Sequence, residues 1–241
     1  MCPYHAHNNA RTPWQPQPWV IPPQANAAWV WALADVLEVY TRPDDPRRPQ
    51  VCLDETSQPW VADTCAPLPA TPGPPTRGDE AEARQGPAHL WMVFEPLAGP
   101  RRVQGTARRT ALDGAPVLQE WVDAQDPQAE QMVLVMDPRN PPKPASRYEA
   151  VAPAEARRVM ARLESHETPT HGRGVDRAET ELSVLATPWL DRRIPDPTTL
   201  TPAVAAWERH RNAAKCRVAW RFTTRHASIT LKRLYPSIQL G

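Results

Sequence analysis

Two adjacent carboxylates, Asp54 and Glu55, follow a short apolar run in the stretch VCLDET. Such a pair could simply end a strand, form a salt bridge, or form one wall of a metal site. A second apolar run, MVLVM, ends in the same way on Asp137. Two-metal phosphodiester chemistry requires carboxylates that converge on ions about 3.5–4 Å apart, and Mg²⁺ prefers such oxygen ligands. The two strand ends therefore supply acids that could hold metal, without deciding among the three roles.

A third acid would have to come from a helix that follows the next strand. Glu179 and Glu181, in the stretch HGRGVDRAETELSVL, are the candidates. Residues two positions apart lie roughly 200° apart around a helix, so both cannot face one ion. Acids at strand ends are common, and these residues taken alone do not establish a metal triad.

The cysteines indicate neither a disulfide framework nor a zinc site. All four are scattered, and no C-x-x-C pair occurs. Cys2, His5 and His7 could together hold a metal, but three ligands so close to the start of the sequence fall short of a zinc signature.

Charge is balanced overall but unevenly distributed. The sequence has 28 Lys and Arg against 27 Asp and Glu, yet the part from Trp207 onward has eight basic residues and one acid, Glu208. This asymmetry favours a surface that faces nucleic acid, and a solvated basic helix is the alternative. The basic residues of this part are Arg209, Arg211, Lys215, Arg217, Arg221, Arg225, Lys232 and Arg233.

Length and hydropathy exclude some classes of protein. No apolar run approaches the about 18 residues that a membrane helix needs, and no signal peptide is recognisable, so we expect a cytoplasmic protein. The 31 prolines far exceed the usual share of about 5%. They cluster at 13–23, 43–49, 67–75 and 138–144, where they separate elements of structure.

The periodicity predicts a mixed α/β fold with one central sheet. A further short strand is expected after the helix over 153–163, and 66–88 is expected to be a long loop. The other expected strands are Gln50–Asp54, His89–Pro96 with its antiparallel partner Arg101–Arg108, and Met132–Met136. Helices are expected over Ala27–Tyr40 (capped by Asn26), Leu112–Ala124, Pro153–Leu163, Val175–Asp191, Thr198–Lys215 and about Thr224–Leu234.

Ordered blocks along nearly the whole chain, from about Trp19, resemble the DDE transposases of bacterial insertion sequences, in the mariner-like superfamily of DDE endonucleases. The blocks are WVIPPQANAAWVWALADVLEVYTRPDDPRRPQVCLDETS, HLWMVFEPLAG, EARRVMARLE, ETELSVLATPWLDRRIPD, and AAWERHRNAA followed by WRFTT and LKRLYPS. The resemblance implies an RNase H-like mixed central sheet flanked by helices, and metal-dependent cleavage and joining of DNA strands. It also implies two Mg²⁺ or Mn²⁺ ions, transposon ends and target DNA as partners, a homodimer by analogy, and association with the nucleoid when DNA is bound.

Carried over by position, the resemblance makes Asp54, Asp137 and Glu179 the catalytic and metal-binding acids. Metal held by these residues would activate water to cut DNA, and the freed 3′-hydroxyl would attack target DNA. Glu181 is then expected to form a surface salt bridge.

Three loops depart from the family pattern. Relatives usually continue the second motif as Asp-Asn-x-Asn-Thr-His, whereas here Pro138 follows Asp137, which removes a backbone donor and favours extended geometry. The third motif, usually His-Gly-Ser-Trp-Leu-Asn, reads HGRGVD, with Asp176 where an amide is normal, and the hairpin loop RGDEAEARQGPA lacks the tyrosines of relatives. These departures leave a second function open, a catalytically inactive remnant that binds DNA or a partner transposase without cutting.

The resemblance divides the chain into four parts. These are an extended Pro-rich segment (1–25), a linker helix and connection (26–49), an RNase H-like catalytic domain (50–197) and a basic helical segment (198–241). Residues 1–25 could not form the helix-turn-helix modules that relatives carry. We therefore expect a truncated copy, or the downstream reading frame of a split element.

Basic side chains are expected to contact DNA phosphates in a sequence-independent, salt-sensitive way. Trp207 and Trp220 are expected to pack in the core, because continuous duplex offers no free base face for stacking. The expected DNA-binding residues are Arg101, Arg102, Arg108, Arg109, Arg211, Lys215, Arg217, Arg221, Lys232 and Arg233.

Overall fold

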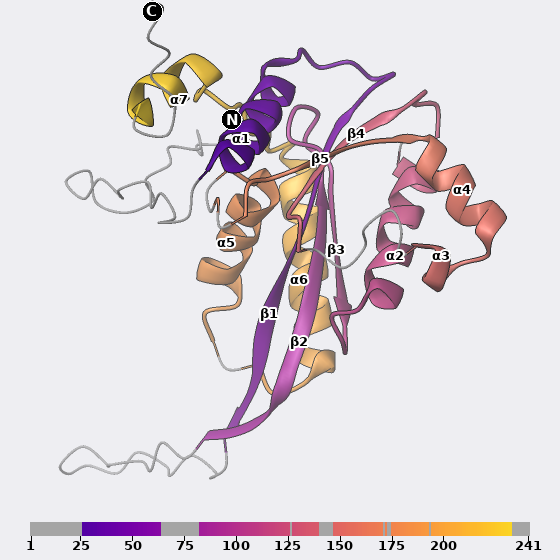
Figure 1. Ribbon diagram of the computed structural model, residues 1–241. Coiled ribbons are helices and arrows are strands. Elements are labelled where there is room, and N and C mark those ends of the chain that lie inside the picture. The colour runs from indigo at the N-terminus through magenta and orange to yellow at the C-terminus, as the bar shows by residue number, and fades with distance from the viewer. Residues whose placement is uncertain are drawn as a thin grey trace, which may run out of the picture.

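A mixed five-stranded sheet forms the centre of the molecule (Figure 1). The computed structural model describes residues 26–63, 82–125, 127–139, 147–170, 172, 175–192 and 194–232. The strands are β1 (Gln50–Asp63), β2 (Glu82–Phe94), β3 (Arg101–Thr106), β4 (Met132–Met136) and β5 (Leu163–Glu167), in the order β3-β2-β1-β4-β5. Strands β1, β2 and β3 pair antiparallel, whereas β4 runs parallel to both β1 and β5.

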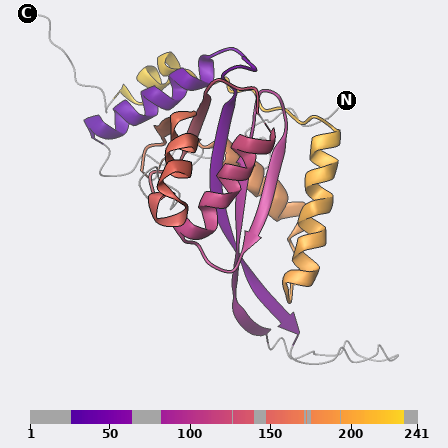
Figure 2. The same cartoon turned by 90° about the vertical axis from the view of Figure 1, so that its right-hand side faces the viewer.

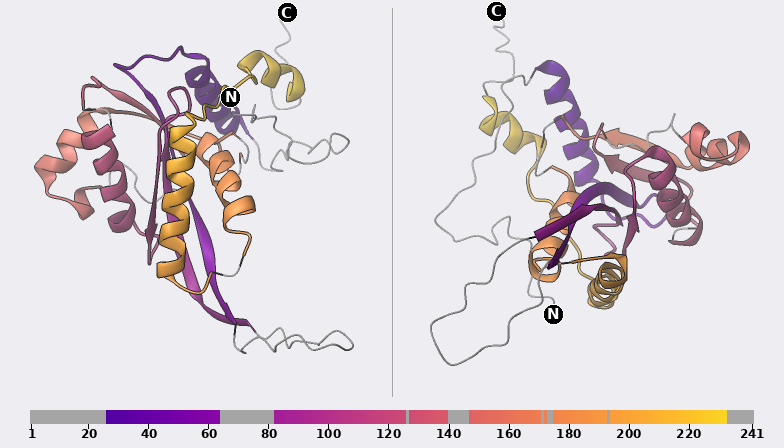
Figure 3. Two further views of the ribbon diagram at one scale, coloured as in Figure 1. Left: turned by 180° about the vertical axis from the view of Figure 1, so that it is seen from behind. Right: turned by 90° about the horizontal axis from the view of Figure 1, so that it is seen from below.

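Helices cover both faces of this sheet. The helices α2 and α4 lie on one face, and α1, α5 and α6 lie on the other (Figures 1 and 2). Figure 3 shows α6 lying beside α5 over the second face. The helices are α1 (Ala27–Thr41), α2 (Ala111–Glu120) continued by the π-helix η1 (Trp121–Gln125), α3 (Arg147–Ala150), α4 (Pro153–Ala161), α5 (Arg177–Trp189), α6 (Pro197–Ala213) and α7 (Thr224–Thr230).

Strand alternation divides the core between the two faces. In β1, Val51 and Leu53 pack with the helix α2, whereas Cys52 packs on the opposite face with α1 and α5. Every residue of β4 is buried, as predicted for a central strand covered on both sides. The residue after Cys52 on the α5 face is Asp54, so the alternation places a carboxylate beneath α5.

The strand β1 is longer than the sequence predicted, and Asp54 is not at its end. Pairing with β4 stops at Leu53, but β1 continues to Asp63 as a ribbon with β2, which itself begins inside the expected loop. The ribbon extends below the helices in Figure 1. Pro59 faces Pro87 across the ribbon, and the register shifts between Pro59 and Val61. A two-stranded ribbon tolerates a pair of prolines and an irregular register. Because proline is unusual inside a strand, the sequence did not predict this part of β1.

Most other predicted elements are confirmed within one or two residues at one end or both. The helix α1 begins after Asn26, whose Oδ1 accepts a hydrogen bond from the Trp29 N–H at 3.1 Å. Trp207 is fully buried, as expected. The predictions for 1–25, and for most of the loops 66–88 and 138–144, fall outside the described residues. None of the described helices is long and apolar enough to cross a membrane.

Candidate active site

Adjacent parallel strands bring Asp54 and Asp137 together. Leu53 of β1 pairs with Met136 of β4, so each acid is the next residue after a paired position. The preceding residue on the same face is Cys52 in β1 and Val135 in β4, and both pack with α1 and α5. The register therefore places Asp54 and Asp137 side by side on the α5 face of the sheet.

The helix α5 brings Glu179 to the same place. Val175 and Ala178, at the start of this helix, belong to the core cluster that contains Cys52. Glu179 lies in the first turn of α5, and its charge acts on the carboxyl of Asp54. The three acids predicted from the resemblance are thus neighbours in space, although 125 positions separate Asp54 from Glu179 in the sequence.

The charges of the neighbouring acids act on the carboxyl of Asp54. Burial, followed by the charges of Glu55, Glu179 and Asp137, raises the pKa of Asp54 to about 7. Within the described part of the chain, Asp54 forms no ion pair with a Lys or Arg. A half-buried carboxylate surrounded by like charges is characteristic of functional sites.

Glu55 has a different environment from its neighbour Asp54. As the next residue of β1 it points to the opposite face of the sheet, where its carboxylate pairs with Arg109. One oxygen, Oε2, is buried and has no hydrogen-bond partner among the residues that the structure describes. Of the roles open to the adjacent pair, Glu55 therefore forms the salt bridge, and Asp54 faces the other acids.

Asp137 is held by the loop that follows it. Its Oδ1 accepts a hydrogen bond from the Arg139 N–H at 2.7 Å and lies 3.7 Å from the Arg139 Nε. Across the described segments, no three His, Cys, Asp or Glu side chains are grouped closely enough to hold one metal ion as they stand. The acids share one face and one electrostatic environment, but their oxygens do not converge on a point.

The prediction of a surface salt bridge for Glu181 is wrong in its location. Glu181 is 1% exposed and forms ion pairs with two buried arginines, Arg101 at 2.8 Å and Arg211 at 2.6 Å. These contacts join α5 to β3 and α6. Arg101 and Arg211 were also expected to bind DNA, and their burial with Glu181 places them in the interior instead. The helical angle between Glu179 and Glu181 explains why one faces Asp54 and the other faces the arginines.

The other predicted DNA-binding residues are mostly exposed. Lys215, Arg217, Arg221 and Lys232 are exposed, whereas Arg233 lies outside the described residues. Three more have acidic neighbours: Arg102 pairs with Glu120 at 2.8 Å, Arg109 pairs with Glu55, and Arg108 lies 3.9 Å from Asp113.

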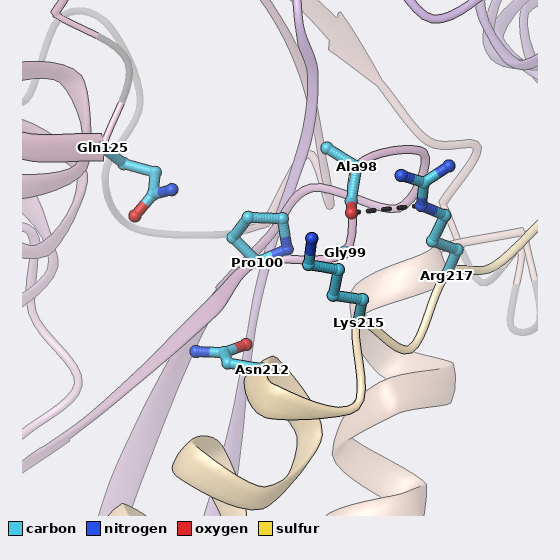
Figure 4. Close-up of a pocket in the computed structure, with 7 residues that line it drawn as sticks. All are labelled: Ala98, Gly99, Pro100, Gln125, Asn212, Lys215 and Arg217. Carbon is cyan, nitrogen blue, oxygen red and sulfur yellow. Dashed lines mark hydrogen bonds between the residues drawn. The ribbon is translucent and has the colours of Figure 1, made fainter. Parts of the chain in front are cut away.

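Lys215 and Arg217 line a pocket of about 450 Å³ beside the turn between β2 and β3 (Figure 4). Arg217 Nε donates to the Ala98 carbonyl at 3.3 Å. Gly99 makes this turn with a φ of 111°, a left-handed conformation that favours glycine. The pocket has two exposed cations on its rim, which suits it to an anion rather than to a metal.

One acid near the site was noticed in the sequence but given no role. Asp176 is 5% exposed and forms the N-cap of α5, where its Oδ1 accepts from the Ala178 N–H at 2.7 Å. Burial and then the charge of Asp54 raise the pKa of Asp176 well above its ordinary value. The signal was an Asp in a motif where the resemblance leads us to expect an amide, and that exchange adds an ionisable group close to Asp54.

The mixed sheet and its two helical layers form an RNase H-like fold. Solved structures of this fold that resemble the chain are complexes of the Mos1 mariner transposase. The paired-end complex with Mg has a TM-score of 0.55 and 13% identity, and the comparison covers 92% of this chain and 67% of that chain. The corresponding values are 0.52, 11%, 83% and 59% for the paired-end complex with Mn, and 0.53, 10%, 95% and 68% for the strand transfer complex.

Sequence comparison adds no relative. No protein-family model and no curated protein matches the chain. The chain spans 59–68% of the length of these Mos1 chains. At 10–13% identity, the likeness to Mos1 establishes the fold.

Proposed function

We propose that this chain is a transposase catalytic domain that cleaves and joins DNA strands with divalent metal on Asp54, Asp137 and Glu179. The observation that carries the proposal is the gathering of these carboxylates from β1, β4 and α5 on one face of the sheet. The likeness to Mos1 complexes, one with Mg and one with Mn, agrees with this chemistry. The bacterial insertion-sequence origin implied by the sequence blocks remains part of the same proposal.

The donor set fits a divalent cation. Mg²⁺ and Mn²⁺ take carboxylate oxygens, and Mg²⁺ keeps several waters, so two or three protein ligands suffice. A cation would also offset the like-charge repulsion that adds to burial in raising the pKa of Asp54. Within the described residues, the contacts of Asp137 with Arg139 use Oδ1, so its Oδ2 is open to a cation.

Each residue of the site has a distinct task in this proposal. Bound metal supplies activation of the attacking oxygen and stabilisation of the leaving oxygen. Asp54 is fixed by a paired region of the sheet, so it sets the position of the site. Glu179 would bind the metal from the first turn of α5, and Asp137 would bind it from the end of β4. Exposed cations such as Lys215 and Arg217 would hold DNA phosphates without reading sequence.

A DNA nicking assay tests the proposal. With Mg²⁺ or Mn²⁺, the wild-type chain should cut duplex DNA, and Asp54→Asn should lose the activity because the amide keeps the shape but not the charge. Asp196→Asn is the matched control, since Asp196 caps α6 and is not among the charges that act on Asp54. Equal cutting by the wild type and Asp54→Asn would refute the assignment.

A second candidate function is a non-catalytic remnant that binds DNA or a partner transposase. The loop after Asp137 favours this alternative. Pro138 follows Asp137 directly, and Arg139 contacts the carboxylate of Asp137 that would have to hold metal. The absence of three converging ligands among the described residues agrees with it. Retention of DNA binding without any metal binding by the wild-type chain would establish this alternative.

A further inference from the structure

The second oxygen of Asp176 has no partner in the described part of the chain. Oδ1 caps α5, but Oδ2 is buried and makes no hydrogen bond. Buried polar atoms in proteins nearly always have a partner, so an unpaired carboxylate oxygen calls for an explanation. N-capping accounts for one oxygen of Asp176 and leaves the other unexplained.

The neighbours of Asp176 place it at the candidate active site. Asp54 and Glu179 are the charges that act most on its carboxyl. Val175 and Ala178, which flank Asp176 in the sequence, pack in the core cluster that contains Tyr40 and Cys52, and the charge of Asp176 adds to burial in raising the pKa values of Tyr40 and Cys52. Cys52 and Asp54 lie two residues apart on one face of β1. Asp176 therefore lies over that face, close to both the buried core and the acids.

The adjacent arginine does not account for the unpaired oxygen. The Arg177 guanidinium lies 3.8 Å from the centre of the Tyr40 ring and donates to Gln50 Oε1 at 3.4 Å. It forms no ion pair with Asp176, and among the described residues its Nε and Nη2 also lack hydrogen-bond partners. Arg177 is thus directed at the aromatic core and leaves Asp176 Oδ2 without a partner in that part of the chain.

We propose that Asp176 is a fourth carboxylate of the metal site and that its Oδ2 supplies an additional oxygen ligand to the divalent metal. This inference rests on the proposed function. With metal bound and all four groups ionised, the carboxylates of Asp54, Asp137, Asp176 and Glu179 would carry four negative charges, which match the charge of two divalent cations. Because Asp176 also caps α5, the same side chain fixes the start of the helix that carries Glu179.

Binding of Mn²⁺, measured by calorimetry and by the EPR signal of free Mn²⁺, tests this role without any assay of activity. Asp176→Asn keeps an oxygen for the cap but removes the charge, and it should weaken Mn²⁺ binding by about 10–100-fold. Asp196→Asn makes the same change at the N-cap of α6 and should bind Mn²⁺ as the wild type does. Asp54→Asn serves as the positive control for loss of binding.

The possible outcomes separate the inference from the proposed function. Wild-type affinity, or higher affinity, in Asp176→Asn together with loss in Asp54→Asn would overturn the role of Asp176 and leave the proposed function standing. A wild-type chain that binds no Mn²⁺ would overturn both. If circular dichroism shows that Asp176→Asn is unfolded, Asp176→Ser provides a second uncharged cap with the same expected loss.

Discussion

Burial and like charge act together on the carboxyl of Asp54, and both oppose its ionisation. They raise its pKa to about 7, whereas an Asp in an unfolded chain titrates near about 3.9. Between these pH values the native state binds more protons than the unfolded state. The free energy of unfolding contributed by this group is therefore fully present below about pH 4 and is lost as the pH rises through about 7. In the metal-free protein this gathering of acids is therefore costly at neutral and higher pH.

Replacement of Asp54 should therefore stabilise the metal-free protein at neutral and higher pH. In EDTA at pH 8, Asp54→Asn should melt at a higher temperature than the wild type, by about 2–4 °C for each kcal/mol relieved in a domain of this size. The difference should shrink as the pH falls toward 4, because the wild-type carboxyl is then protonated. Thermal unfolding followed by circular dichroism between pH 4 and 8 measures it. A difference that does not vary with pH would contradict the assigned cause.

The resemblance located Asp54, Asp137 and Glu179 in the sequence, because motif spacing identifies residue types. The same approach gave Asp176 no role, because only the folded chain brings it close to Asp54, whose charge adds to burial in raising the pKa of Asp176. The prediction for Glu181 was wrong because the sequence does not show which charged side chains are buried. Glu181 was expected at the surface, and nothing in its local sequence shows that Arg101 and Arg211 arrive from other elements to pair with it.

At the scale of elements, α5 positions three acids. Asp176 caps its start, Glu179 faces β1, and Glu181 enters the interior to meet β3 and α6. The helical repeat separates the direction of Glu179 from that of Glu181. The contacts of Glu181 hold the helix against two neighbouring elements, which also fixes the turn that carries Glu179. Sequence periodicity could find this helix, but it could not find the β1–β2 ribbon, whose polar residues and Pro59 show no alternation.

Loss of Glu181 should destabilise the fold strongly. Glu181→Ala leaves Arg101 and Arg211 buried without their carboxylate, and removal of one partner from a buried ion pair costs about 3–5 kcal/mol. Glu130→Ala removes an exposed ion pair with Arg47 and should cost less than about 1 kcal/mol. Urea unfolding of both variants gives the comparison. Equal losses would show that the buried network adds nothing beyond a surface pair.

At the scale of the whole molecule, the acids and the exposed cations lie in different places. The acids lie on the α5 face of the sheet, whereas Lys215 and Arg217 line a pocket beside the β2–β3 turn (Figure 4). Much of the sequence-predicted order of helices and strands is present, since long apolar periods specify it. The distribution of charge over the surface could not be read in the same way, because Arg101 and Arg211 are buried and only part of the expected basic set is exposed.

DNA binding distinguishes a phosphate-contacting surface from a merely solvated one. The double variant Lys215→Ala/Arg217→Ala should bind duplex DNA more weakly for every sequence, and the slope of log K against log salt should fall by about 2, one for each lost phosphate contact. Arg157→Ala/Arg192→Ala removes the same charge from two other exposed positions and is the control for net charge. Fluorescence anisotropy across a salt series measures both slopes. If both double variants lose affinity equally, only the net charge of the molecule matters, and the pocket beside the β2–β3 turn has no special part in holding DNA.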